Sequence, residues 1–390
     1  MKKQILATLV ASALMGVAQA EVTLYDYEEG TSAFEEAYVN GSLDVSKNRG
    51  DGQSAYNLYL DANYDRTIST PDRDLSFGGY VSGTVNRSST KDADSTDTYT
   101  ANASVTADNY FQPGSNGAFW YGSASAAAVD SFDDMFTTAS VGVGYGRVTN
   151  VTPMAKAIRI VDELVKYNVL RGKPGKAVYQ DIARIVSKES EYSSRYGNKD
   201  YELKWIGDIE AALQRSGMLN NLGAAGVLKA RKVLMDEHIS NRRIGWKVRA
   251  GLGYVGSNFD GLTNKPLLEA GAEYHLPLSN QTQLSDEAVF RAVLNDGDNG
   301  YNFNNTLSLT HEIDDRIDWE NAWSLDYAKN SANGDDVTTN TLSSTFAYEI
   351  NNALDFTTTA RVANVKGSSD VTNPDGTDRA LTMGVRYRLR

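Results

Sequence analysis

The sequence predicts a membrane-spanning antiparallel β-barrel with one inserted α-helical domain. Apolar and polar residues alternate at period two over two long regions, 37–148 and 244–390, which is typical of strands with one apolar and one wet face. Between them, residues 150–243 show helical spacing instead. No stretch of 18 consecutive apolar residues occurs, so any membrane crossing would be made by strands.

The N-terminus has the pattern of a secretory signal peptide over residues 1–20. Lys2 and Lys3 precede a short apolar run, 5–17, and Ala18-Gln19-Ala20 offers small residues for cleavage before Glu21. The run is too short to cross a bilayer of about 30 Å as a helix. An uncleaved anchor is the alternative.

Composition narrows the class of protein further. The chain has 22 Tyr and 33 Gly but only 7 Pro, which suits strands whose two faces meet different solvents. It has no Cys, which excludes disulfides and thiolate chemistry and agrees with an oxidising export route. The formal net charge of −12 argues against nucleic acid as a partner. No cofactor is expected.

The first barrel part, 21–149, contains six expected strands. The alternation is clear near Tyr56–Tyr64, where Leu58 and Leu60 share a face opposite Asn57 and Asp61. The expected strands lie near 37–46, 54–66, 74–86, 97–109, 118–129 and 135–148. Glycines 142, 144 and 146 fall inside the last of these, so they indicate relief of crowding or a bend and not a phosphate-binding loop.

The second barrel part, 244–390, contains eight expected strands. They lie near 244–254, 266–276, 284–295, 301–313, 317–327, 340–350, 354–365 and 379–390. The total of about fourteen is even, as single-chain barrels with both ends on one side require; 12 or 16 are the alternatives. Longer acidic connections at 87–97 and 366–378 would face outside, and tight links such as 314–316 would face the periplasm.

The insertion, 150–243, should fold as a small helical domain. Four apolar stripes predict four helices, the first with Thr152 as N-cap and Pro153 as first residue, the second opened by Pro174. The segment carries 17 Lys and Arg against 11 Asp and Glu, opposite in balance to the barrel parts. It follows a sixth strand that runs inward, which places it in the periplasm; a miscounted strand would place it outside.

The last strand carries a specific motif, 382–389, read as Thr-Met-Gly-Val-Arg-Tyr-Arg-Leu. Its polar residue, glycine, aromatic and terminal hydrophobic, Thr382, Gly384, Tyr387 and Leu389, resemble the C-terminal assembly signal of bacterial outer-membrane β-barrel (porin-like) proteins. The resemblance implies outer-membrane lipid and the barrel assembly machinery as partners. Many members end in Phe, whereas this chain ends in Arg390.

The wet strand faces should line the lumen and set its selectivity, if a channel exists. The charged candidates are Lys247, Arg249, Glu269, Glu273, Asp318, Glu320, Asp326, Arg361, Arg386 and Arg388. The alternative is that these residues pair across the lumen and only hydrate its wall. Because Lys247, Arg249, Arg386 and Arg388 fall near the periplasmic strand ends, we expect a basic inner mouth.

The sequence favours an outer-membrane pore or passive transporter for small hydrophilic solutes, with a periplasmic helical domain that gates it or docks a partner. Two other classes of function compete with this prediction. A hydrolase would need His238, His275 or His311, expected on the last helix, in the lumen and toward lipid, but no nucleophile motif accompanies them and no metal-ligand spacing occurs. A scaffold would use the basic helical domain to bind peptidoglycan or a periplasmic protein, against the alternative of a merely solvated surface. Arg242 and Arg243 would bind phosphate headgroups.

Overall fold

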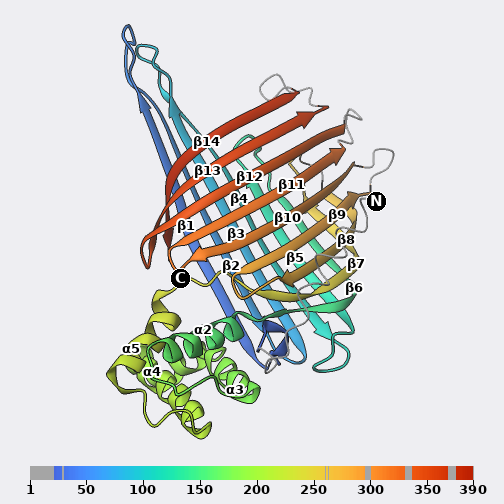
Figure 1. Cartoon of the computed structure of the whole chain (residues 1–390). Coiled ribbons are helices and arrows are strands. Elements are labelled where there is room, and N and C mark those ends of the chain that lie inside the picture. The colour runs from blue at the N-terminus through green and yellow to red at the C-terminus, as the bar shows by residue number, and fades with distance from the viewer. Residues whose placement is uncertain are drawn as a thin grey trace, which may run out of the picture.

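The computed structural model describes residues 22–28, 30–259, 261, 263–294, 300–329, 336–367 and 375–389. It is a closed barrel of fourteen antiparallel strands, with a helical domain between the sixth and seventh (Figure 1). The predicted fold class is therefore confirmed. The predicted signal peptide and most of the predicted 366–378 loop lie outside the described residues.

The strands run in chain order around the barrel. Six precede the helices: β1 Ser32–Ser46, β2 Ala55–Ser69, β3 Arg73–Arg87, β4 Ser95–Tyr110, β5 Ala118–Val129 and β6 Phe136–Asn150. Eight follow them: β7 Arg243–Ser257, β8 Thr263–Pro277, β9 Thr282–Val293, β10 Gly300–Asp314, β11 Ile317–Lys329, β12 Asp336–Asn351, β13 Leu354–Lys366 and β14 Gly376–Arg388.

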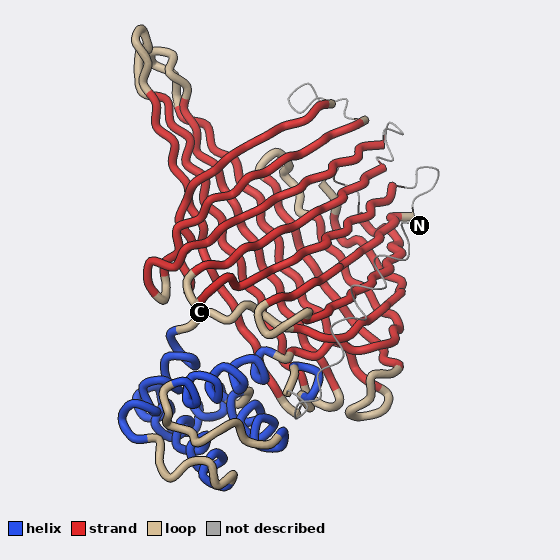
Figure 2. Tube along the Cα trace, in the orientation of Figure 1, coloured by secondary structure: helices blue, strands red, loops and turns tan. Residues whose placement is uncertain are grey.

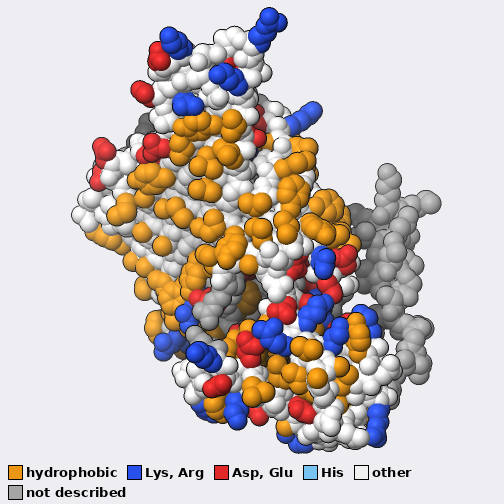
Figure 3. Space-filling model, turned by 90° about the vertical axis from the view of Figure 1, so that its left-hand side faces the viewer, with side chains coloured by type: hydrophobic (Ala, Val, Ile, Leu, Met, Phe, Trp, Pro, Cys, Tyr) orange, Lys and Arg blue, Asp and Glu red, His pale blue; other side chains and the backbone are white. Residues whose placement is uncertain are grey.

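The alternation of each strand separates an apolar outer face from a polar lumen. Trp319 and Phe346, for example, stack on the outside at 5.8 Å between ring centroids, while Asp318 and Glu320 turn inward. Figure 3 shows hydrophobic side chains over the barrel wall, with charged side chains gathered above and below them. Such a band is typical of a barrel wall that faces lipid. Among the described residues, no helix is long and apolar enough to cross a bilayer.

The two ends of the barrel differ. Tight turns such as Asp315-Arg316 and Asn352-Ala353 connect strands at one end, which also carries the helical domain (Figure 2). At the other end β1–β4 extend beyond their neighbours as a long tongue. Its two loops are held together by bonds from Gly52 N to Ser89 O at 3.1 Å and from Gln53 Nε2 to Ala93 O at 2.8 Å.

The helical domain folds around its own apolar core. Its helices are α2 Thr152–Lys166, α3 Lys176–Val186, α4 Glu189–Arg215 and α5 Gly223–Arg231, followed by the π-helical turn η2 Lys232–Asp236. Their apolar faces meet around Trp205, whose Nε1 donates to Ile185 O at 2.7 Å. This core is built almost wholly from residues of the helical segment, with Leu24 added from before β1 and Ile244 of β7 packed against its edge, so the domain has an apolar core of its own.

The predicted helix starts need small corrections. Val151, not Thr152, is the N-cap of α2, because the Thr152 hydroxyl oxygen accepts the backbone N–H of Arg242 at 2.9 Å. The second helix begins two residues after Pro174, at Lys176. The third is bent at Gly197, whose φ of 74° is a conformation that glycine adopts without strain.

The segment before β1 ties the helical domain to the barrel. Leu24, in the short 3₁₀ turn η1 Leu24–Asp26, is buried in the helical core. Asp26 forms an ion pair with Lys176 at 2.7 Å, and Tyr25 donates to Pro277 O at the end of β8 at 3.2 Å. The described start of the chain therefore packs at the short-turn end.

Candidate functional site at the short-turn mouth

The linker Glu237–Arg242 leads from η2 to β7 across the short-turn mouth of the barrel. The chain leaves the helical conformation at Glu237, which has extended backbone angles. His238 therefore lies in the linker, so the prediction that it sits on the last helix is wrong. Ile239 turns back into the helical core, while its neighbours face the barrel. The linker thus has one apolar anchor and a polar face.

Glu312, at the short-turn end of β10, clamps this linker. Its carboxylate, 2% exposed, accepts Arg242 Nη2 at 2.7 Å and the backbone N–H of Ser240 at 3.2 Å. Arg159 of α2 donates to the other carboxylate oxygen. Arg242 is fully buried, so the prediction that it contacts headgroups is wrong. One carboxylate thus joins barrel, linker and helical domain.

A second set of charges continues the clamp on the helical side. Glu237 Oε2 lies 3.6 Å from Arg159 Nη1, and Lys232 bridges Glu237 at 3.1 Å and Asp315 of the β10–β11 turn at 3.4 Å. Beside these contacts, a cavity of about 420 Å³ separates α2 from the β8–β9 turn. The domain is therefore held mainly by ion pairs, with space left beside it.

A polar cavity of about 230 Å³ lies between the linker and the lumen wall. Its lining includes His238 and Ser240 of the linker, Glu36 and Tyr38 of β1, and Arg386 of β14. His238 Nε2 lies 3.9 Å from Glu36 Oε1. Burial, with the nearby cations Arg388 and Arg386, lowers the pKa of His238 well below 6.5, so the imidazole is neutral at neutral pH.

Three of the four cations that were predicted to make a basic inner mouth, Lys247, Arg386 and Arg388, have a carboxylate partner. Arg386 forms two bonds to Glu320, at 2.7 and 2.9 Å, and Arg388 pairs with Asp355 at 2.8 Å. Each guanidinium would have to break its ion pair before it could bind an anionic solute. Local charge balance, not net charge, characterises this wall.

The opposite wall is neutralised in the same way. Lys247 lies 2.8 Å from Asp108 and 3.5 Å from Glu273, and Glu269 pairs with Arg291 at 2.8 Å. Arg249 stands over the ring of Tyr121 at 5.7 Å. These contacts favour the alternative in which lumen charges pair with each other.

The remaining lumen candidates are dispersed. Asp318 and Asp326 occupy inward positions of β11, and Asp326 accepts Asn304 Nδ2 at 2.6 Å. Arg361 occupies an inward, exposed position of β13, paired in register with Ala380. The structure therefore does not gather the ten candidates into one site.

Sequence reasoning missed several buried partners. Arg147 of β6 reaches Asp74 of β3 at 2.7 Å, with Tyr110 donating to the same carboxylate at 2.9 Å. Gly146, at φ 101°, turns the strand so that Arg147 faces inward against the alternation. The inward orientation of Arg147 depends on this backbone irregularity, and nothing in the residue types around it predicts that orientation.

The glycine run of β6 relieves crowding, as the sequence indicated. Phe119 and Tyr121 of β5 are fully buried on the lumen side. A Cβ added to Gly144 would stand 2.2 Å from Phe119 Cζ, and one added to Gly142 would stand 2.6 Å from Tyr121 Cε1. The two rings therefore occupy space beside β6 that is free only because positions 142 and 144 are glycines.

The histidines do not form a recognisable catalytic arrangement. His275 Nδ1 lies 2.9 Å from Ser285 Oγ, but these two are direct register partners on β8 and β9. The carboxylates of Glu273 and Glu287 lie 3.8 and 3.7 Å from Nε2, beyond hydrogen-bond distance. His311 pairs with Thr282 at 2.9 Å. Within the described ranges, no three side chains gather as metal ligands.

The residues of the terminal motif lie on both faces of β14. Thr382 and Gly384 occupy inward positions, while Tyr387 and Leu389 are exposed on the outer face. Tyr387 pairs in register with Val39 of β1, and Leu389 N donates to Ala37 O at 2.7 Å. The motif therefore lies where the barrel closes.

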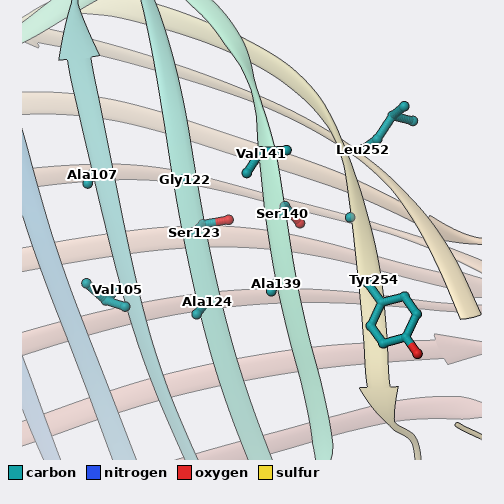
Figure 4. Close-up of a pocket in the computed structure, with 11 residues that line it drawn as sticks. Val105, Ala107, Gly122, Ser123, Ala124, Ala139, Ser140, Val141, Leu252 and Tyr254 are labelled. Atoms are coloured by element: carbon teal, nitrogen blue, oxygen red, sulfur yellow. The ribbon is translucent and has the colours of Figure 1, made fainter. Parts of the chain in front are cut away.

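The outer wall has one broad apolar hollow, of about 580 Å³, over β4–β7 (Figure 4). Small side chains make its floor, Ala107, Gly122, Ala124 and Ala139, and the larger Val141, Leu252 and Tyr254 border it on the side of β6 and β7. Because it faces away from the lumen, it offers no place for a hydrophilic solute.

Comparison with known proteins adds little beyond this geometry. A family described as "Protein of unknown function, DUF481" matches residues 236–350, less than half of the chain. No curated protein matches. The matching part runs from the end of η2 through β12.

Solved structures that resemble the chain are outer-membrane barrels. A loop-deletion mutant of OmpT, an outer membrane protein of Vibrio cholerae, is 9% identical (TM-score 0.31; 92% of this chain, 100% of that chain). The translocator domain of the autotransporter NalP from Neisseria meningitidis is 9% identical (0.30; 98% and 98%). Salmonella typhi OmpF in complex with daunomycin is 11% identical (0.32; 93% and 99%). Because these TM-scores are all below 0.5, the assignment of the architecture rests on the strand pairing within this chain.

Proposed function

We propose that this chain is an outer-membrane pore for small hydrophilic solutes, gated at its periplasmic mouth by the linker Glu237–Arg242 and the helical domain. The observation that carries the proposal is the clamp at Glu312, which holds a polar linker against the inner mouth. Release of this one carboxylate would remove contacts that the linker makes with the barrel and with the helical domain at the same time. The protein has no catalytic role in this proposal.

Three features support membrane placement and side. The outer wall is apolar and the lumen polar, as a barrel in lipid requires. Tight turns, the helical domain and the described start and end of the chain share one end, and short turns of bacterial barrels face the periplasm. A strand count of fourteen is wide enough for a lumen that side chains alone do not fill.

Planar-bilayer recording of purified, refolded protein tests the proposal. Because Asn150 and Arg243 are register partners, residues 151–242 can be replaced by a two-residue Asn-Gly turn without moving either strand. Wild-type protein should give discrete conductance steps, and the deletion variant should give larger ones. Silence from both proteins, when each is shown to be a folded barrel, would rule out the pore.

A second candidate is a scaffold whose helical domain binds anionic cell-wall polymer or an acidic periplasmic protein. Leu203 and Leu228 are 71% and 66% exposed on a domain with excess positive charge. Co-sedimentation with purified peptidoglycan should retain the full chain and lose the deletion variant. Equal retention of both would place the binding on the barrel or show it to be unspecific.

A further inference from the structure

β1 and β14 close the barrel along only part of their length. Their register partners run from Tyr38 and Arg388 to Gly41 and Val385, and the pairing then ends. β1 nevertheless continues to Ser46, paired with β2 throughout, and β14 starts back at Gly376, paired with β13. Figure 1 shows the two strands separating toward the long-loop end. Ser42 and Gly384 still lie against each other, because a Cβ added to Gly384 would stand 3.6 Å from Ser42 Cβ. We call the segments 43–46 and 376–383 the seam gap.

The part of the seam gap next to the paired residues lies within the apolar band of the wall. The outward side chains Leu43 and Val45 of β1 are 61% and 64% exposed, and Leu381 and Met383 of β14 are 68% and 60% exposed. An unpaired strand edge facing lipid is costly, because each free N–H and C=O lacks a hydrogen-bond partner there. Among the described residues, no other strand pairs with these two edges.

The inner rim of the gap has the opposite character. Asp44 of β1 and Thr382 of β14 occupy inward positions and are exposed. Water from the lumen can therefore reach the unpaired edges, while the outer rim stays in contact with acyl chains. A molecule lying across this gap would meet polar groups inside and apolar groups outside.

The geometry favours an amphiphile over a peptide strand as the occupant. β1 and β14 are antiparallel to each other, so one inserted strand would have to run parallel to one of them and break the alternation of the barrel. An amphiphile with its headgroup in the lumen and its acyl chain in the bilayer requires no parallel strand pairing. Its headgroup would contact the polar inner rim, and its acyl chain would contact the apolar outer rim.

We propose that the seam gap is a lateral portal, through which an acyl-chain amphiphile passes between the lumen and the leaflet at the long-loop end. The proposal depends on the membrane placement given above. It does not depend on conduction of hydrophilic solutes, so the portal proposal and the pore proposal can be disproved separately.

Disulfide trapping tests whether the gap is open in a membrane. The chain has no cysteine, so introduced pairs report alone. Val39→Cys with Tyr387→Cys joins true register partners and serves as the control. Val45→Cys with Leu381→Cys joins positions that would be partners if the pairing continued four residues past Gly41 and Val385, in the same hydrogen-bonding class as the control pair.

Under mild oxidation in lipid vesicles, the control pair should cross-link nearly completely and the gap pair should stay largely reduced. Equal cross-linking of the two pairs would show a fully zipped seam and overturn the portal. Heat-dependent gel migration confirms that each variant is a folded barrel before oxidation.

Lipid access gives a second, independent readout. A bimane label is placed on Thr382→Cys at the gap and on Thr106→Cys, an inward position on β4, which is three strands away from β1. In phosphatidylcholine vesicles with nitroxide-labelled acyl chains, quenching at position 382 should exceed quenching at 106 several-fold. Equal, weak quenching at both would exclude acyl-chain entry, even if conductance steps are seen.

Discussion

Lys247 of β7 places its ammonium nitrogen 2.8 Å from Asp108 Oδ2 of β4, across the inner face of two intervening strands. Both side chains are nearly fully buried. This ion pair, with the Arg147–Asp74 pair beside it, ties distant strands of one wall together at the short-turn end.

Removing one partner should destabilise the barrel strongly. Lys247→Met leaves Asp108 and Glu273 buried without their cation, a change that costs about 3–5 kcal/mol in buried pairs. Urea unfolding in phospholipid vesicles, followed by tryptophan fluorescence, measures the loss. Lys329→Met, on β11, is the control, since no ion pair of Lys329 occurs among the described residues. Equal stability of the two variants would contradict the buried-pair account.

The packing of Phe119 against β6 gives a matched pair of glycine variants. Gly144→Ala would push a methyl group into the Phe119 ring and should cost about 1–3 kcal/mol of unfolding free energy. Gly122→Ala meets nothing within 4 Å and should be close to neutral. Adding Phe119→Leu to Gly144→Ala should recover part of the loss. The same urea titration checks all three, and a neutral Gly144→Ala would disprove the crowding.

Leu24 should stabilise the helical domain although it precedes the first strand. Leu24→Ala empties a buried site in the helical core and should cost about 2–5 kcal/mol of that domain's stability. Limited proteolysis of the folded barrel should then cut between α2 and η2 faster than in wild type. Leu203→Ala, at an exposed position, controls for loss of a leucine and should not change the rate.

Acidification should loosen the linker through His238. Its pKa is lowered in the closed mouth, so a released linker binds more protons below its ordinary pKa of about 6.5. Lowering the pH from about 7.5 to about 5.5 therefore favours release and should raise conductance. The charged groups around the ring are Glu36, Glu287, Glu320, Arg242, Arg243, Arg386, Arg388 and Lys156. His238→Gln should remove this increase in conductance at low pH. If His238→Gln showed the same pH response as wild type, the response would belong to the neighbouring charged groups and not to His238.

The fold was predictable because period-two alternation is a local property. Residues 317–327 alone separate Trp319 and Trp323 from Asp318 and Glu320, and the structure turns the first pair outward and the second inward. Repeated over each strand, such patterns fix the class and the strand count without knowledge of partners.

The site was less predictable because its contacts cross strands. Nothing local indicates that Lys247 meets Asp108, since which strands face each other depends on how the barrel closes. Gly146 reverses the alternation at Arg147, so a parity rule assigns that side chain to the wrong face. The pairing of Arg242 with Glu312 depends on where the helical domain docks, which no spacing in the sequence encodes.

The central claim, that the clamp at Glu312 holds the linker across the mouth, is tested most directly by single-channel conductance of Glu312→Gln. The substitution keeps the side-chain volume but leaves Arg242 and Arg159 without their shared carboxylate. Asp181→Asn is the control, because this carboxylate is exposed on α3 and pairs with Arg184 of the same helix. The account predicts larger steps for Glu312→Gln than for wild type and unchanged steps for Asp181→Asn. Identical conductance in all three proteins would contradict it.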